Sequence, residues 1–227
     1  MAHIAVFFSE IPHGKVLSID STKALELDGV IAVLDPFNTT KNKYSRYKTR
    51  DEQTVDLTER IFTDYPRFVG DPIAAVIAET EEIARKAVKL IKVEYEEYPY
   101  ALTAEEALSG KIDNISEKGP ISAELSKVYG DEDINCDDCI KVTTEVEIQR
   151  LHHAAMETHA CVVDIDFSND SIIVYSPNQS VFGIRTLVSN LFEIPNHKVR
   201  IVKTTMGGSF GAKQEWIVEP IAVACAL

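Results

Sequence analysis

The chain has 227 residues, of which 45% are hydrophobic and 26% are charged, and its formal net charge at pH 7 is -13. This composition excludes wholesale disorder and indicates a globular protein of one or two domains. The acidic charge excludes nucleic acid and anionic membranes as electrostatically favoured partners, and the lack of both a basic leader and an apolar run of roughly 20 residues predicts a cytoplasmic protein without a membrane-spanning helix.

The first part of the chain is predicted to alternate short strands with helices. Its first three predicted strands are residues 3–8, 15–20 and 30–34. Between the second and the third, Ser21 or Thr22 can cap a short helix that ends at Leu27, and Gly29 stands where a left-handed residue often ends a helix. Residues 35–65 are polar without a sustained period, which is typical of a functional or mobile loop.

The clearest supersecondary pattern follows. Residues 72–79, PIAAVIAE, form an apolar run that predicts a buried strand, and Thr80 is expected to cap a three-turn amphipathic helix. Residues 92–98, KVEYEEY, predict another strand, and Thr103 with Glu106 fits the capping box of a further short helix. This order of elements predicts a β-α-β unit with a right-handed crossover.

The second part of the chain is predicted to be a separate domain. Residues 109–138 are polar and charged and are interpreted as a linker between domains at 1–108 and 139–227. A strict period of two over residues 140–149 predicts a half-buried strand. The elements expected after it are a hairpin of residues 161–167 and 171–176, a helix at 180–192 and a strand at 198–203.

Two groups of residues are potential metal ligands. They are Cys136 with Cys139, and His152, His153 and His159. A zinc or iron–sulfur site needs about four ligands, and no second cysteine pair at matching spacing is present. Only Glu157 stands at a usual ligand offset from a paired histidine. We therefore predict reduced cysteines on an acidic loop and no metal site at the histidines.

A glycine-rich stretch, TTMGGSFGAKQEW, follows the last predicted strand. Gly207, Gly208 and Gly211 can bring backbone amides close to an anion or an oxo group. A nucleotide-binding P-loop is the nearest rival, but Ala212 replaces its second glycine and Gln214 its metal-binding hydroxyl. No G-x-G-x-x-G motif is present either. The stretch is therefore either a ligand-binding loop or a structural turn.

The segment MGGSFGAKQE resembles the G-G-G-F-G-G-K-E loop of the molybdenum hydroxylases, the xanthine dehydrogenase and aldehyde oxidase family. The resemblance extends over essentially the whole chain in the family's order. The other segments that resemble this family are EIPHGKVLSID, FVGDPIAAVIAETEEIARKAVKLIKVEYEEYP, RLHHAAMETHACVV, IIVYSPNQS and NHKVRIV.

This resemblance implies an α+β fold, with an α/β-hammerhead domain followed by part of a mixed α+β molybdenum-cofactor-binding domain. It implies a molybdenum–pterin cofactor (molybdopterin), with FAD and 2Fe–2S clusters on other domains or subunits. The implied reaction hydroxylates an aldehyde or a purine-like aromatic N-heterocycle with oxygen from water. The implied partners are the rest of the molybdenum subunit and the iron–sulfur and FAD subunits, in an oligomer.

The resemblance also assigns site residues. Gln179 would hydrogen-bond the apical oxo group of the molybdenum, and Gln214 stands where purine-oxidising members carry a glutamate. An amide cannot titrate, so xanthine turnover is not expected. The backbone positions assigned to the cofactor are Gly207, Gly208, Phe210 and Gly211.

The family's large subunits supply further pterin contacts and a general-base glutamate from segments that this sequence does not contain. The chain is therefore expected to be inactive alone. The alternative is a non-catalytic assembly or anion-binding module, which predicts that no molybdenum binds. Unpaired strand edges in such a partial domain would favour oligomers.

Overall fold

A computed structural model describes residues 1–46, 57–112, 119–121, 124, 126–130, 140 and 142–227. The chain forms two compact units, of which the first combines residues 1–98 with 153–227 and the second comprises residues 99–152. Cys136 and Cys139, and with them the cysteine-pair interpretation, lie outside the described residues. Among the described helices, none has the length and apolar character needed to cross a membrane.

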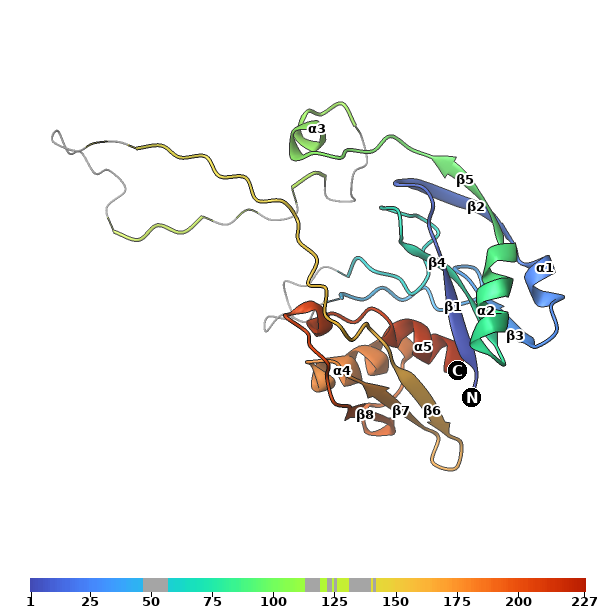
Figure 1. Ribbon diagram of the computed structural model, residues 1–227. Helices are drawn as coiled ribbons and strands as arrows, with labels where there is room; N and C mark the ends of the chain where they lie inside the picture. Colours follow the sequence, from blue (N-terminus) through green and yellow to red (C-terminus); the bar gives the residue numbers. More distant parts are fainter. Residues whose placement is uncertain (47–56, 113–118, 122–123, 125, 131–139, 141) are drawn as a thin grey trace. The chain divides into compact units, whose positions relative to one another are not determined.

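The N-terminal part of the first unit contains two antiparallel sheets (Figure 1). One has the strand order β1-β4-β3, and the other pairs β2 with β5. The strands are β1 (His3–Phe8), β2 (Gly14–Asp20), β3 (Val30–Leu34), β4 (Pro72–Ala78) and β5 (Lys92–Glu97). All five predicted strands of this part are confirmed. Strand β4 is the central strand of its sheet and is almost wholly buried, because every residue in it is apolar.

The predicted β-α-β crossover in this part is wrong. Strand β4 leads into helix α2 (Glu81–Ala87) and a 3-10 turn (Val88–Leu90), but β5 then joins β2 instead of the sheet that contains β4. The reason lies in β5 itself. Its charged residues alternate with apolar ones and remain exposed, so it suits a two-sided antiparallel ribbon better than a buried parallel sheet.

The predicted helix caps at Thr80 and Thr103 are confirmed. The Thr80 hydroxyl accepts a hydrogen bond from the Ile83 N–H of α2 at 3.2 Å. Thr103 and Glu106 form the expected capping box of α3 (Ala104–Leu108), which belongs to the second unit. Helix α1 (Thr22–Leu25) is shorter than expected, and Ser21 at its N-cap makes no side-chain cap.

The C-terminal part of the first unit contains a three-stranded sheet with the order β6-β7-β8. Its elements are β6 (Val162–Asp166), β7 (Ser171–Ser176), α4 (Val181–Phe192), a 3-10 turn (Asn196–Lys198), β8 (Val199–Lys203), a second 3-10 turn (Ala212–Gln214) and α5 (Glu219–Ala226). Strands β6 and β7 form the predicted antiparallel hairpin, whereas β8 runs parallel to β7. A β-α-β connection through α4 is therefore present here.

The strand predicted at residues 140–149 is wrong. Residues 142–150 are exposed and form neither helix nor strand. The alternating pattern is present, but a strand needs a hydrogen-bonded neighbour, and an isolated extended segment is not stable as a sheet.

One hydrophobic core joins the two parts of the first unit. Ile61 and Phe62, from the predicted loop at 35–65, are 1% and 2% exposed and pack with residues of β7, α4 and α5. Tyr44 and Glu59 exchange two backbone hydrogen bonds of 2.9 Å. Part of that predicted loop is therefore anchored in the core.

Candidate functional site

The glycine loop, residues 204–211, connects β8 to the 3-10 turn before α5. Its backbone is left-handed at Gly208 (φ 97°), Phe210 (φ 52°) and Gly211 (φ 93°). A residue with a side chain adopts this conformation at a cost of roughly 1–2 kcal/mol. Phe210 does so although its ring is 76% exposed and packs little. The loop therefore holds a strained backbone at an exposed position, as binding loops often do.

Glu157 secures the start of this loop. Its carboxylate accepts hydrogen bonds from the Gly207 N–H at 2.9 Å and from the Lys213 ammonium at 2.5 Å. Its own N–H donates to the Gly207 carbonyl at 3.3 Å. A β-carbon on Gly207 would lie 2.8 Å from the Glu157 β-carbon, so glycine is required here by packing against Glu157. The hydrogen bond from Lys213, then that from Gly207, lowers the pKa of Glu157.

A ring of contacts links Gln179 to the same loop. The Ser209 hydroxyl donates to the Gln179 side-chain oxygen. The Gln179 N–H donates to the Lys213 carbonyl at 2.9 Å, and the Lys213 N–H donates to the Ser209 hydroxyl at 3.2 Å. The structure thus brings together Gln179 and the loop that contains the predicted positions Gly207, Gly208, Phe210 and Gly211. Gln214 is exposed just after the loop and donates its N–H to the Gly211 carbonyl at 3.2 Å.

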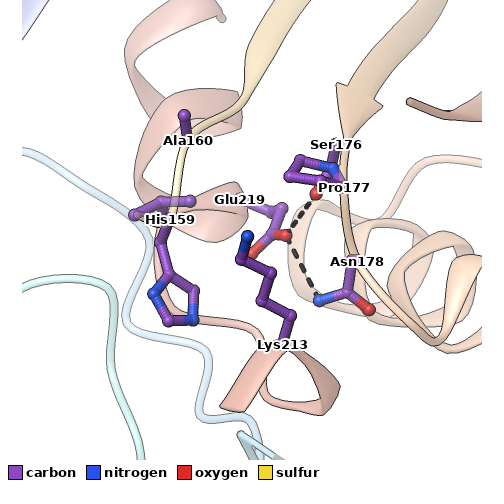
Figure 2. A pocket seen from close by; sticks show the side chains of 8 residues that line it. His159, Ala160, Ser176, Pro177, Asn178, Lys213 and Glu219 are labelled. Carbon is purple, nitrogen blue, oxygen red and sulfur yellow. Dashed lines mark hydrogen bonds between the residues drawn. The ribbon is translucent and has the colours of Figure 1, made fainter. Parts of the chain in front are cut away.

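A buried carboxylate shapes the turn that carries Gln179. Glu219, at the start of α5, is 3% exposed and accepts hydrogen bonds from the Ser176 hydroxyl at 2.7 Å and the Asn178 amide at 3.3 Å (Figure 2). The Asn178 amide also donates to the Glu215 carbonyl at 3.0 Å. These contacts tie the end of β7 to the start of α5 and so fix the position of the turn after β7.

A shallow recess lies beside this turn. It is lined by His159, Ala160, Ser176, Pro177, Asn178, Lys213, Val218 and Glu219, most of which Figure 2 labels. The His159 Nε2 lies 3.3 Å from the Ala212 carbonyl oxygen, so this histidine contacts the turn that follows the glycine loop. Among the residues that the structure describes, no three His, Cys, Asp or Glu side chains are grouped in a way that could hold a metal ion.

Sequence reasoning missed Glu157, Lys213 and Glu219 as parts of this site. From the sequence, Glu157 is considered only as a potential metal ligand near the paired histidines, and neither Lys213 nor Glu219 is assigned a role in the site. Their partners lie more than 40 residues away in the sequence, so no local spacing could indicate the contacts. The motif that contains Glu157, in the stretch RLHHAAMETHACVV, was the one available signal.

Cys161 is expected to resist alkylation. Burial, followed by the negative charge of Glu219, raises the pKa of Cys161 to about 12. At pH 8 the thiolate fraction is then very small, and reaction with iodoacetamide should be about a hundredfold or more slower in the folded chain than in urea. Site-resolved mass spectrometry would measure both rates. Equal rates would show that the thiol is accessible and ionises normally.

Models of known protein families match both the N-terminal and the C-terminal part of the chain. The family model "Molybdopterin cofactor-binding domain" matches residues 115–227, and the model "Aldehyde oxidase and xanthine dehydrogenase, a/b hammerhead domain" matches residues 1–99. A probable xanthine dehydrogenase subunit of Bacillus subtilis (strain 168) is 34% identical over 230 residues, which cover 100% of this chain and 30% of that protein. The nicotinate dehydrogenase large molybdopterin subunit of Eubacterium barkeri is 33% identical over 221 residues, with coverages of 96% and 50%.

Solved structures show the same fold. The aldehyde oxidoreductase from Desulfovibrio gigas matches with a TM-score of 0.81 and 22% identity over 99% of this chain and 25% of that one. The quinoline 2-oxidoreductase from Pseudomonas putida 86 matches with a TM-score of 0.74 and 26% identity over 93% and 28%. The predicted α+β fold, with a hammerhead domain followed by part of a cofactor-binding domain, is confirmed. The chain spans half or less of the length of these relatives.

Proposed function

Because the chain belongs to the xanthine dehydrogenase and aldehyde oxidase family of molybdenum hydroxylases, we propose that it supplies the hammerhead domain and the first part of the molybdopterin-binding domain of such an enzyme. The observation that carries this proposal is the strained glycine loop joined to Gln179 through Ser209 and Lys213. The alternative is a non-catalytic assembly or anion-binding module.

The residues present fit a molybdenum–pterin group. The N–H groups of Phe210 and Gly211 are on an exposed loop and donate to no residue that the structure describes. A β-carbon on Gly208 would lie 3.3 Å from the Phe210 ring, and the backbone there is left-handed, so glycine suits this position of the loop. The charge of Lys213 is already paired with Glu157. Neutral amides therefore remain as donors, which suit oxo and dithiolene ligands because they carry no competing acid proton.

When bound, the molybdenum–pterin group would supply the redox chemistry of a hydroxylation that uses oxygen from water. The Gln179 amide and the loop amides would hold and orient the group through hydrogen bonds. Gln214 would face the substrate side, where an amide can hydrogen-bond a substrate but cannot take up or release a proton. This favours an aldehyde, or an aromatic N-heterocycle other than xanthine, as the substrate.

The remaining parts of the enzyme would come from elsewhere. FAD and 2Fe–2S clusters would lie on other domains or subunits, and further pterin contacts and a general-base glutamate would come from the rest of the large subunit. One relative is named the 6-hydroxypseudooxynicotine dehydrogenase complex subunit gamma of Paenarthrobacter nicotinovorans, so that protein belongs to a complex. We infer a cytoplasmic, oligomeric assembly in which this chain alone is inactive.

The test is a chimeric protein in which this chain replaces the aligned region of the Bacillus subtilis relative, expressed with that enzyme's other subunits. We expect molybdenum and pterin to co-purify with the chimera and not with the chain alone, because only the former completes the site. A chimera that folds without either component would support the anion-binding alternative. Hydroxylation of any aldehyde or purine by the isolated chain would contradict its inactivity.

Gln214 provides a second arm of the test. In the loaded chimera, Gln214→Glu is expected to raise xanthine turnover by about tenfold or more, because the carboxylate restores proton exchange beside the substrate. The matched control is Gln214→Asn, which keeps the amide. Equal xanthine turnover in both variants would show that Gln214 does not face the substrate.

A further inference from the structure

The turn of residues 212–216, which carries Gln214, is held from both parts of the first unit. Near its start, the Lys213 carbonyl accepts a hydrogen bond of 2.9 Å from the Gln179 N–H. At its end, the Trp216 N–H donates to the Arg46 carbonyl at 3.0 Å. The N-terminal part of the unit, through Arg46, therefore fixes one end of the turn that follows the glycine loop.

The side chain of Arg46 is anchored by two carboxylates. Its Nε lies 3.0 Å from an oxygen of Glu59, and its Nη2 lies 3.8 Å from an oxygen of the buried Asp71. Tyr44, two residues before Arg46, exchanges two backbone hydrogen bonds of 2.9 Å with Glu59. The backbone and the guanidinium of this segment are both held in place, and with them the carbonyl that meets Trp216.

The charge balance of this cluster argues against an anion-binding site. Arg67 contacts the same two carboxylates, at 2.9 Å from Glu59 and 3.3 Å from Asp71. Among the residues that the structure describes, two cations thus face two anions. Burial alone would raise the pKa of Glu59, but the hydrogen bond from Arg67 and the charges of both arginines lower it, so this carboxylate stays ionised at neutral pH. The arginines are therefore engaged within the chain.

We propose that Arg46 is a positioning residue for the molybdenum–pterin site, which places the turn of residues 212–216 against the glycine loop through its carbonyl. The inference rests on the proposed function, because that function gives the turn a cofactor and a substrate to face. Arginine suits the role because its planar guanidinium can meet two carboxylates at fixed angles, whereas the ammonium of lysine is a point charge. Such support matters because a site that is loose by about 1 Å often fails to work.

Amide hydrogen exchange of the full chain tests the local effect. Arg46→Met keeps roughly the length of the side chain and removes its charge, so the Trp216 amide should exchange about tenfold or more faster than in the wild type. The Trp216 ring is buried in the shared core, so β4 and β7 should keep their protection. Arg46→Lys should restore part of the protection at Trp216, because an ammonium can still pair with one carboxylate.

Arg60→Met is the matched control for these variants. The side chains of Arg60 and Arg46 are 30% and 31% exposed, and Arg60 also pairs with a carboxylate, that of Asp64 at 2.7 Å. Exchange at Trp216 should change by less than about twofold in this control, because surface ion pairs contribute little to stability.

Cofactor content measures the consequence in the site. In the chimera with the Bacillus subtilis relative, Arg46→Met should lower the molybdenum and pterin content by about tenfold, because losing an outer support of a metal site typically costs about 10–100-fold in affinity or activity. Arg60→Met should change this content by less than about twofold.

The outcomes separate this inference from the proposed function. Unchanged exchange at Trp216 in Arg46→Met would overturn the inference, and so would full cofactor content in a variant whose Trp216 amide has become exposed. If Arg46→Met also loses protection in β4 and β7, Glu59→Gln, which weakens the hold on Arg46 and keeps the shape of the side chain, is measured by the same criteria. A wild-type chimera without molybdenum and pterin would contradict the proposed function, and the cofactor role of Arg46 with it, even if exchange at Trp216 responds as expected.

Discussion

Replacing Phe62 with alanine is expected to lower the free energy of unfolding by about 3–5 kcal/mol, the usual cost of removing a buried aromatic ring and leaving a cavity. Phe62 is 2% exposed and belongs to the core that joins the N-terminal part of the first unit to β7, α4 and α5. The loss should therefore affect both parts together. Urea unfolding followed by the fluorescence of Trp216, the single tryptophan and a member of the same core, would measure it.

Phe167→Ala is the matched control for this measurement. Phe167 is 89% exposed beyond the end of β6, so its loss should change the free energy of unfolding by less than about 0.5 kcal/mol. If Phe62→Ala were as mild as the control, the two parts would not depend on a shared core. Separate transitions of the two parts in the wild type would lead to the same conclusion.

Replacing Lys213 with methionine is expected to lower the molybdenum and pterin content of the chimera by about tenfold or more, because it removes the charge-assisted hydrogen bond that holds the Glu157 carboxylate beside the glycine loop. The Lys213 side chain is 2% exposed, and its ammonium lies 2.5 Å from the Glu157 carboxylate that also binds the Gly207 N–H. Methionine keeps roughly the length of the side chain but removes the charge. The glycine loop should then be held less firmly by Glu157.

The control for this variant is Lys198→Met, because Lys198 also lies 2.5 Å from a carboxylate, that of Asp170, in the C-terminal part of the first unit. The side chains of that pair are 32% and 87% exposed, and surface ion pairs contribute little to stability. Cofactor content in this variant should change by less than about twofold. Full cofactor content in Lys213→Met would show that Lys213 does not help to hold the cofactor.

Acid should weaken the same contact. The pKa of Glu157 is lowered in the folded chain, so the stabilisation is complete above the ordinary carboxyl value of 4.5 and is lost as the pH falls through the lower, folded-state value. The cofactor content of the wild-type chimera should fall in this acidic range. The cofactor content of the Glu157→Gln chimera should be lower than that of the wild type above this range, and it should vary less with pH within it.

Local patterns in the sequence were enough to predict several elements of the fold. All-apolar β4 and the capping residues Thr80 and Thr103 were predicted because each depends on residues within a few positions. The crossover was wrong because the partner of β5 is β2, which lies far away in the sequence. The pattern at 140–149 was recognised, but no pattern can show whether a neighbouring strand exists.

The residues of the candidate site also divide into those that a local motif indicates and those that depend on contacts between distant parts of the sequence. Gln179 and the glycine loop were found through the family's motif, and the structure places them in contact. Gly207 is predicted to let the backbone approach a ligand, and the structure adds that a β-carbon there would lie 2.8 Å from the Glu157 β-carbon. The roles of Glu157 and Lys213 depend on a contact across 56 residues, which composition and spacing do not reveal.

The shared core also has a consequence for biosynthesis. A ribosome releases Ile61 and Phe62 long before β7, α4 and α5, which cover them in the finished chain. The N-terminal sheets can pair early, but their apolar surface stays uncovered until the segment that holds β7, α4 and α5 has been made. Late closure of distant contacts is slow and leaves nascent chains open to aggregation. Such a protein should rely on chaperones while these later elements are being translated.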